Sequence, residues 1–501
     1  MLIRHLRIPN VHFTRTFASY TRAQQNLSPV AASAPTPFPP SALRADAPYF
    51  YRIPEYMMET DILPVDPTKL GKLVIKQSEE EPLVEEWDIE YEEGQAFENL
   101  QRAAKELRET DTPVAFPTET VYGLGADATR SSAVRAIFAA KGRPADNPLI
   151  VHVHSIAQLR NLILGGQEAH HGGPDPIPDI YKPLIKKFWP GPLTVILPAP
   201  KGSVLAPEVT AGLDTFGARM PRSILSLALM RLAGVPLAGP SANASTRPSP
   251  TAAEHVKNDL DGRIHTIIDG GPCEVGVEST VVDGLSLPPT ILRPGGVTVE
   301  QLRQCPGWED VVVGYKDNHE QGIKPRAPGM KYRHYSPKAT VILYEAGAKM
   351  PLQEDIVGQG KGYKSVGIIR SKLWPKVIGL PVEEEMAATG TTNGVLEPAP
   401  APLADSSNPT LSNLLRSVIQ HQIPHASHHI LQTSVSHPIS VWDIALGTST
   451  EEVARGLFSA LRELDKREVD VIFVEGIDDG VGNDIAAAVM NRLRKAAEIK
   501  I

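Results

Sequence analysis

The sequence predicts two α/β domains, a larger one over residues 95–304 and a smaller one over residues 339–501. In both regions, short apolar stretches typical of buried strands alternate with amphipathic helical stretches. In the first region several of these strands end in Ser, Thr, Asn or Arg next to Gly or Pro. Because ligand sites in open α/β sheets form at strand ends, we expect the functional site in the first domain.

The composition of the 501 residues limits the classes of protein and site to be considered. A hydrophobic content of 42% indicates a globular chain, and the net charge of −8 offers nucleic acid no overall polycation, although a local basic groove stays open. The two cysteines, Cys273 and Cys305, form neither a disulfide framework nor a Cys-based zinc site, so a reducing compartment is expected. No apolar run is long enough to span a bilayer.

Residues 1–94 are expected to precede the folded domains as a transit-like and then acidic disordered segment. No Asp or Glu occurs before Asp46, and five arginines do, which resembles a mitochondrial transit peptide; the alternative is a plain disordered tail. The acidic stretch 79–93 predicts a solvated approach segment rather than a metal site. We therefore expect a cytoplasmic protein that is also directed to the mitochondrion, and a chain beginning near Tyr91 that keeps full activity.

The elements of the first domain follow from hydrophobic periodicity and turn residues. We expect helices over 95–109 and 131–140, with strands over 113–116 and 149–153. The later elements are strands at 194–197, 214–221, 236–238, 277–283 and 290–293, a helix that Ser249 opens and caps, and a closing helix that starts over 299–303.

Two stretches of the first domain concentrate groups that bind anions. Pro117-Thr118-Glu119-Thr120-Val121-Tyr122-Gly123-Leu124-Gly125 places hydroxyls at a strand end, with glycines that let backbone approach closely. Lys141 and Arg143 follow the next helix two residues apart, which in an extended segment puts both cations on one side. Taken singly, the first stretch reads equally as a capped turn and the second as a solvated helix end. Their combination predicts a phosphate or other anion site.

Together with Ser241-Ala242-Asn243, these stretches resemble the threonylcarbamoyl-AMP synthase (YrdC-like) family in its long, two-domain form. The resemblance is strong over about residues 95–340 and weaker over the C-terminal domain. It implies a YrdC-like twisted mixed open sheet with helices enclosing a cationic cavity, followed by a smaller Rossmann-like parallel α/β domain. Two residues depart from the family's pattern: Gly239 stands where Ala is frequent, and Thr246 where Gly is common.

The resemblance also implies the reaction. L-threonine, bicarbonate and ATP would give threonylcarbamoyl-AMP and pyrophosphate, with Mg²⁺ accompanying ATP. The product would pass to a tRNA threonylcarbamoyl transferase complex for t6A modification, with at most a weak tRNA contact and no membrane partner. The sequence has no Gly-x-x-x-x-Gly-Lys-Ser/Thr phosphate loop and no recognisable nucleophile–base pattern. This fits chemistry that depends on placement and charge stabilisation.

Site residues are carried over from the family position by position. Threonine would be surrounded by Thr118, His152, Arg219 and Ser279. ATP would contact Lys141, Arg143, Asn147, Thr215, Ser241, Asn243, Ser249, Arg293, His334 and Tyr335. Lys141, Arg143, Ser241 and Asn243 would act in catalysis, and no residue is expected to hold a resident metal.

The remaining chain is expected to form a linker and the second domain. Residues 305–338, with the basic and aromatic run that ends in His334 and Tyr335, would close over the active site; a passive tether is the alternative. In the second domain we expect strands at 340–344, 365–369 and 469–474 and helices at 450–466 and 485–497. Residues 384–436 predict a disordered insertion, with a helix near 411–420, whose deletion would leave stability nearly unchanged. Gly480-Val481-Gly482 lacks the rest of a dinucleotide fingerprint, so no such cofactor is expected.

Two other functions are open at this point. The first is an RNA-binding regulatory module of YrdC-like fold without adenylation activity, against which stand the negative net charge and the lack of an aromatic strip for base stacking. The second is a carbamoyl-transfer domain that uses carbamoyl phosphate, which would typically lie beside zinc-finger and acylphosphatase modules that this sequence lacks.

Overall fold

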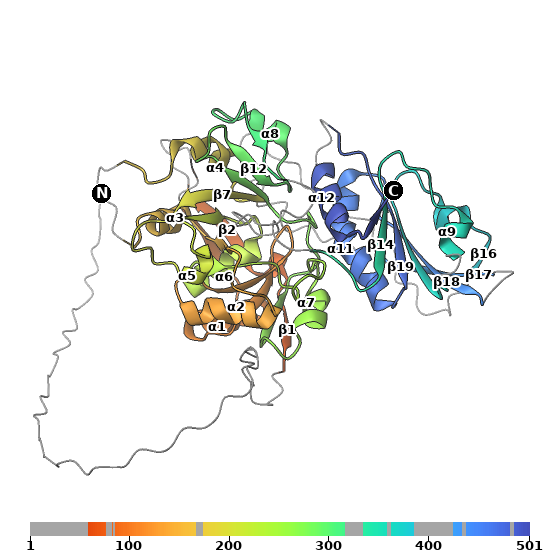
Figure 1. The fold of residues 1–501 in the computed structure, drawn as a ribbon. Coiled ribbons are helices and arrows are strands. Elements are labelled where there is room, and N and C mark those ends of the chain that lie inside the picture. Colours follow the sequence, from red (N-terminus) through yellow and green to blue (C-terminus); the bar gives the residue numbers. More distant parts are fainter. Residues whose placement is uncertain are drawn as a thin grey trace, which may run out of the picture. The chain divides into compact units, whose positions relative to one another are not determined.

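The computed structural model describes residues 59–76, 83, 86–166, 174–315, 334–357, 362–384, 424–432, 437–480 and 485–501. These residues form one compact unit with two large sheets, each with its helices and its own hydrophobic core, and a two-stranded sheet (Figure 1). The helices in the part of the chain that the structure describes are too short or too polar to cross a membrane.

The first domain is built on an eleven-stranded mixed sheet. Its strands, in spatial order, are β1 (Asp61–Pro64), β10 (Thr266–Asp269), β4 (Val114–Pro117), β5 (Tyr122–Asp127), β9 (Leu237–Ala238), β6 (Ile150–His152), β8 (Thr215–Arg219), β7 (Leu193–Pro198), β11 (Thr280–Asp283), β12 (Thr290–Arg293) and β13 (Val312–Val313). Parallel and antiparallel pairs both occur, for example β6 with β8 and β4 with β5. The expected mixed sheet is confirmed.

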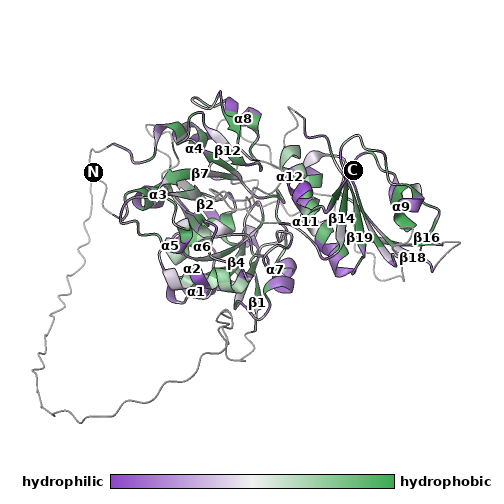
Figure 2. Cartoon of the chain, viewed as in Figure 1, coloured by the Kyte–Doolittle hydropathy of each residue, from purple (hydrophilic) through white to green (hydrophobic). Residues whose placement is uncertain are grey.

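Eight α-helices accompany this sheet in the described part of the first domain. They are α1 (Gln95–Glu109), α2 (Ser131–Lys141), α3 (Ile156–Ile163), α4 (Lys182–Phe188), α5 (Pro207–Thr210), α6 (Ile224–Ala233), α7 (Ala253–Leu260) and α8 (Val299–Arg303). In α1 the buried stripe includes Leu100, Ala104 and Leu107, whereas α6 is buried over most of its length. In Figure 2 the strands are mostly hydrophobic, whereas the helices mix hydrophobic and hydrophilic residues, as expected for helices with one face toward the core.

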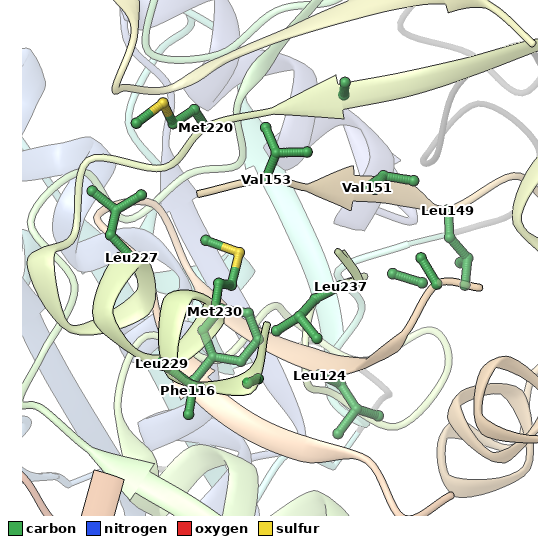
Figure 3. Packing of buried hydrophobic residues seen from close by; sticks show 14 of the residues in the cluster. Phe116, Leu124, Leu149, Val151, Val153, Met220, Leu227, Leu229, Met230 and Leu237 are labelled. Atoms are coloured by element: carbon green, nitrogen blue, oxygen red, sulfur yellow. The ribbon is translucent and has the colours of Figure 1, made fainter. Parts of the chain in front are cut away.

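The core beneath the anion-binding stretch explains one of its glycines. Figure 3 shows Phe116, Val151 and Met230 in one buried cluster that joins strands of the sheet to α6. A Cβ at Gly125 would lie 2.7 Å from the Phe116 ring, closer than packed atoms allow. This glycine therefore serves the packing of the core, and the anchored ring keeps β4 and β5 in place behind the site.

The N-terminal boundary at residue 94 is wrong, because part of the preceding chain is folded. β1 adds to the edge of the sheet beside β10, and β2 (Gly71–Lys76) and β3 (Glu86–Tyr91) form an antiparallel pair. A short 3-10 turn, Pro67–Lys69, lies between β1 and β2. Trp87 is buried, donates its indole N–H to the His154 carbonyl at 2.8 Å, and carries the Arg231 guanidinium over its ring at 5.1 Å. The acidic stretch thus includes a strand that packs on the domain.

The C-terminal boundary of the first domain also lies later than residue 304. Cys305, Trp308 and Val311 are buried, and the Trp308 indole donates to the Ile180 carbonyl at 2.8 Å. β13 then pairs with β12. Of the expected linker, the structure describes 305–315, which belongs to the domain, and 334–338; residues 316–333 lie outside the described residues.

The second domain has a seven-stranded sheet in the order β16 (Val382–Glu384), β17 (Ser427–Leu431), β18 (Ile439–Ala445), β15 (Ser365–Arg370), β19 (Val471–Glu475), β14 (Thr340–Tyr344) and β20 (Ile499–Lys500). The five strands from β18 to β20 are parallel, as expected of a Rossmann-like domain. Alternate residues of β14 face opposite cores. Val341 packs with α11 (Thr450–Lys466) and α12 (Ala486–Ala496), and Ile342 with α9 (Gln353–Val357). A 3-10 segment, Lys376–Gly379, precedes β16.

The expected disordered insertion at 384–436 is wrong for its last part. β17 lies inside that range and pairs with both β16 and β18. The predicted helix near 411–420 lies outside the described residues. The sequence of β17 did not predict a strand because it is polar and rich in histidine. Of its residues only Ile430 and Leu431 are aliphatic, and only His429 and Leu431 are buried.

Deleting residues 384–436 is therefore expected to destabilise the second domain, because it removes β17 and uncovers the edge of β18. A point variant tests the same contact: Leu431→Ala, at a side chain with no exposure, should cost about 2–5 kcal/mol of unfolding free energy. Leu373→Ala, at a side chain that is 79% exposed, is the matched control and should change the denaturation midpoint little. Equal midpoints for the two variants would show that β17 does not pack in solution.

Candidate functional site

The cavity of the first domain brings together most of the residues expected to form the site. Twelve of the fourteen expected residues line it: Thr118, Lys141, Arg143, His152, Arg219, Ser241, Asn243, Ser249, Ser279, Arg293, His334 and Tyr335. They come from strand ends, one helix end and the segment before β14, which are far apart in sequence. The described lining also includes Thr120, Arg247 and Glu278, which the sequence prediction missed.

Asn147 and Thr215 are not among the residues that line the cavity. Thr215 begins β8, whereas Arg219 ends it, so the two lie about 13 Å apart along the strand. Asn147 is buried in the segment between α2 and β6, where its amide donates to the Asp146 carboxylate at 3.2 Å. Their contact with ATP therefore stays a prediction.

Lys141 is the last residue of α2 and reaches into the cavity from its C-terminal end. Gly142 adopts the left-handed conformation, with φ of 61°, and ends the helix there. The ammonium group donates to the carbonyl oxygens of Ser241 and Asn243, the second at 2.6 Å. Burial, followed by the positive charge of Arg143, holds the pKa of Lys141 well below its usual range. An anion bound beside it would relieve both effects.

The loop after β9 holds the polar wall opposite α2. Gly123 and Ser241 form an isolated bridge, which continues the pairing along β5. The Ser241 hydroxyl donates to the Asn243 side-chain oxygen at 2.5 Å, and the Asn243 amide donates to the carbonyls of Ala244 and Arg247. The side chains of Ser241 and Asn243 therefore shape the loop, and the loop carbonyls fix Lys141.

Arg219 lies at the end of β8, and three hydrogen-bond partners fix the orientation of its guanidinium group. It donates to the Gly191 carbonyl, to the Thr120 hydroxyl at 2.9 Å and to the Glu119 carboxylate at 2.6 Å. Both charged side chains are almost without exposure, at 5% for Arg219 and 0% for Glu119. The Thr118 hydroxyl meets that of Thr120 at 2.8 Å. This buried pair and its hydroxyls give one end of the cavity a rigid set of donors suited to a small carboxylate.

His152, at the end of β6, is neutral in this cavity. Burial, helped by the nearby charge of Arg219, lowers the pKa of the imidazole to about 3. Its Nδ1 has no hydrogen-bond partner among the described residues. A Cβ at Gly239 would lie 2.8 Å from that nitrogen, so the glycine that departs from the family's pattern leaves the ring accessible on one side.

Arg293 and Ser279 form the wall at β11 and β12. Arg293 donates to the Ser279 carbonyl at 2.9 and 3.0 Å and to its hydroxyl at 3.1 Å. The Ser279 hydroxyl also meets the Thr194 hydroxyl at 2.8 Å. Burial lowers the pKa of the Arg293 guanidinium to about 10, so it remains protonated at neutral pH.

Ser249 has a different role from the helix cap that its sequence predicted. α7 begins only at Ala253, and Ser249 instead donates to the Glu278 carboxylate at 2.5 Å inside the cavity. Burial would raise the pKa of Glu278, but the guanidinium groups of Arg492 and Arg293 overcome that effect and lower it. The residue before Ser279 is thus an ionised carboxylate in a cavity that is otherwise cationic.

His334 and Tyr335 complete the lining from the segment that precedes β14. Tyr335 has φ of 67°, is buried, and stacks on Phe458 of α11 with ring centroids 5.1 Å apart. The next residue, Ser336, donates its N–H to the Thr246 carbonyl at 3.0 Å. Thr246 itself has φ of 75°, a conformation that favours glycine and so accounts for the glycine that is common there in the family.

The charge balance of the cavity decides what it can bind. Its described lining has five Lys or Arg side chains (Lys141, Arg143, Arg219, Arg247 and Arg293) and one carboxylate, Glu278. The hydroxyls lie between these cations, and the two ends of the cavity differ: Arg219 with threonines at one, Lys141 and Arg143 with the Ser241–Asn243 loop at the other. Such an arrangement suits a small carboxylate beside a phosphate-bearing ligand.

Comparison with known proteins agrees with this reading. A family model described as "Telomere recombination" (Sua5, YciO, YrdC) matches residues 106–295, and one described as "Threonylcarbamoyl-AMP synthase, C-terminal domain" matches residues 297–498. The threonylcarbamoyl-AMP synthase of Schizosaccharomyces pombe is 41% identical over 88% of this chain and 98% of its own length. That of Bacillus subtilis is 41% identical over 79% of this chain and 92% of its own length.

A solved structure matches both domains. The crystal structure of Sua5 from Pyrococcus abyssi complexed with L-threonine is 36% identical, covers 80% of this chain and 96% of its own, and superposes with a TM-score of 0.57. The similarity to full-length relatives, the two family models and the cavity coincide. The chain therefore belongs to the threonylcarbamoyl-AMP synthase family, in the form that carries the C-terminal domain.

Proposed function

We propose that this enzyme is an L-threonylcarbamoyladenylate synthase, a nucleotidyltransferase that converts L-threonine, bicarbonate and ATP into threonylcarbamoyl-AMP and pyrophosphate. The observation that carries the proposal is the convergence of Lys141, Arg143 and Arg293 with the Arg219 end in one cavity. The names of the full-length relatives and the L-threonine in the Pyrococcus complex support the choice of substrates.

The threonine end of the proposed site is the Arg219 end. The carboxylate of threonine would take the remaining donor directions of Arg219 and the nearby hydroxyls of Thr118 and Ser279. Because His152 is neutral, its ring can exchange a hydrogen bond with the substrate without repelling or attracting charge. The amino group would then point toward the cationic end.

The chemical step requires charge to be held while two bonds change. The threonine amine and bicarbonate give a carbamate and water. A carbamate oxygen then forms a bond to the α-phosphorus of ATP, and the bond between that phosphorus and the pyrophosphate oxygen breaks. Negative charge grows on the phosphate oxygens and on the leaving pyrophosphate. Lys141 and Arg143, with Arg293, are the cations placed to hold it, which makes placement and electrostatic stabilisation the main contributions of the protein.

Magnesium is proposed to enter bound to the phosphates of ATP. Protein sites for Mg²⁺ commonly use one or two carboxylates together with substrate phosphates. Within the described residues no group of three or more His, Cys, Asp or Glu side chains could hold a metal, and Glu278 is already paired with Arg492. The ion would supply further positive charge at the pyrophosphate.

The labile product implies a downstream acceptor. A mixed anhydride of carbamate and phosphate reacts readily with water, so we propose transfer to a tRNA threonylcarbamoyl transferase complex that forms t6A. We further propose that the enzyme acts in the cytoplasm and, through its Arg-rich, acid-free first residues, in the mitochondrion.

The proposal is tested by following pyrophosphate release from ATP in the purified full chain. In CO₂-depleted buffer we expect release only when threonine, bicarbonate and Mg²⁺ are all present, and a fall to background when any one is omitted. Equal release without threonine would point to a different adenylation reaction. No release from the complete mixture would contradict the proposed function.

A further inference from the structure

The C-terminal domain contributes buried side chains to the loops that form the cavity. Three side chains of α11 make these contacts. Arg455 donates to the Glu274 carbonyl, and the Ser459 hydroxyl meets that of Thr251. Arg462 donates to the Pro248 carbonyl and to the Asp259 carboxylate. Asp465 of the same helix accepts from Arg247, which lines the cavity. The two domains thus meet along the segments that carry Ser249 and Glu278.

The backbone itself comes close at this meeting. Gly276 has φ of 78°, and a Cβ there would lie 2.4 Å from the Arg455 Cα and 2.6 Å from the Ala454 carbonyl. α11 therefore rests directly on the turn before Glu278, with no side chain between them. Such a close backbone contact fixes the position of that turn relative to α11.

Arg492 of α12 continues this contact into the cavity wall. The side chain is without exposure, donates from Nε to the Glu278 carboxylate at 3.1 Å, and donates from a terminal nitrogen to the Pro294 carbonyl at 2.6 Å. Its guanidinium also lies 6.0 Å from the centre of the Tyr335 ring. One side chain of the second domain thus touches the residue before Ser279, the residue after Arg293 and the closing tyrosine.

We propose that Arg492 is a positioning residue of the synthase site: it neutralises Glu278 and holds it against Ser249, so that the cations of the first domain face the nucleotide. The inference rests on the proposed function and assigns to the C-terminal domain a part in ATP binding. Arg293 is the other cation whose charge acts on Glu278, and the proposed reaction assigns it to the phosphates.

The surroundings of Glu278 indicate how the loss would depend on pH. The titratable and charged groups that face it are Arg492 of α12, Arg293 at the end of β12, Lys141 of α2, and His334 and Tyr335 from the segment before β14. Removing Arg492 takes away the largest of the influences that lower the pKa of Glu278, whereas burial, which raises it, remains. In the variant, the unpaired carboxylate would weaken ATP binding when it is ionised at higher pH. It would weaken binding less when it is protonated at lower pH.

The test measures kcat/KM for ATP and the melting temperature of full-length variants at pH 6 and pH 8. For Arg492→Met we expect a loss of about 100-fold at pH 8, the range found when one partner of a buried charge pair is removed, with partial recovery at pH 6. The double variant Arg492→Met/Glu278→Gln should return to within about tenfold of the wild type at both pH values, since it leaves no unpaired charge.

Arg462→Met is the matched control for lost domain contact. It removes another buried arginine, whose carboxylate partner in the first domain is Asp259. Asp259 does not line the cavity, and in the variant it would still have an ion pair with Arg247 at 3.0 Å. The loss of activity in Arg462→Met should be the same at both pH values. The same pattern for Arg492→Met, or a double variant that melts normally yet is no more active than Arg492→Met at pH 8, would overturn the proposal.

Two outcomes remain to be separated. If Arg492→Met does not fold, the double variant decides alone: activity near that of the wild type supports the proposal, and an inactive protein of normal melting temperature overturns it. If the wild type itself makes no threonylcarbamoyl-AMP, the proposed function has failed, whatever the variants do.

Discussion

Replacing Lys141 with methionine is expected to lower the rate of adenylate formation by at least about 100-fold, because a preorganised charged donor to a transition-state oxyanion contributes that much. Lys141 is 3% exposed, and its hydrogen bonds to loop carbonyls already aim the ammonium group into the cavity. Methionine is unbranched and only one atom shorter than lysine, so the main change is the loss of charge and donors.

The measurement is threonine-dependent pyrophosphate release, with the melting temperature as a check on folding. Lys105→Met is the control, since Lys105 lies on α1 with 68% of its side chain exposed and pairs with Glu109 of the same helix. We expect that variant to match the wild type. Turnover of Lys141→Met near that of the wild type would remove Lys141 from the mechanism.

Starting the chain at Tyr91 is expected to destabilise the first domain strongly, in contrast to the expectation from sequence alone. The truncation removes β1 from the sheet edge, together with the buried side chains of Leu63, Leu70 and Trp87. It also uncovers the apolar surface on which they rest. The free energy of unfolding of a domain is commonly about 5–15 kcal/mol. We expect the truncation to remove most of it and to leave little soluble protein.

A single substitution tests the same packing without truncation. Trp87→Ala should cost about 3–5 kcal/mol, the usual range for a buried aromatic side chain, and should leave the KM for ATP unchanged in the protein that folds, since Trp87 does not line the cavity. A chain that starts at Glu59 keeps β1 to β3 and serves as the control. Equal melting temperatures for the chains that start at Glu59 and Tyr91 would show that the hairpin is dispensable.

Much of the fold followed from local patterns in the sequence. The α1 and α11 helices begin and end where their apolar stripes and flanking residues predict, and α11 has the expected capping box at Ser449 and Glu452. Seven strands of the first domain (β4, β6, β7, β8, β9, β11 and β12) were expected within a few residues of their observed bounds, whereas β1, β5, β10 and β13 were not expected. Periodicity and capping act within one or two turns of chain, so one sequence reveals them directly.

What the sequence did not reveal depends on residues that are distant in the chain. β1 is four residues long and gains its stability only by pairing with β10, about 200 residues later. Ser249 looks like a cap because Pro250 and a helix follow it, but Glu278 provides a stronger partner for its hydroxyl. The partner of Glu278, Arg492, lies on the last helix in an ordinary amphipathic pattern. No local motif distinguishes such a residue from any other helix arginine.

The residues that line the cavity were predicted better than the contacts that hold them in place. The family's pattern located twelve residues that line the cavity and missed others such as Arg247. It also did not show that Glu119 holds Arg219 or that loop carbonyls hold Lys141. These supporting contacts join different strands and loops, and only the assembled sheet brings them within hydrogen-bond distance.

Synthesis of threonylcarbamoyl-AMP is tested most directly by mass spectrometry of the product after the full chain is incubated with ATP, Mg²⁺, L-threonine and ¹³C-labelled bicarbonate. We expect an adenylate that contains one threonine and one labelled carbonyl carbon, formed by the wild type and lost in Lys141→Met. Unlabelled adenylate, or AMP formation without any threonine-containing adenylate even when the reaction is quenched early, would contradict this expectation.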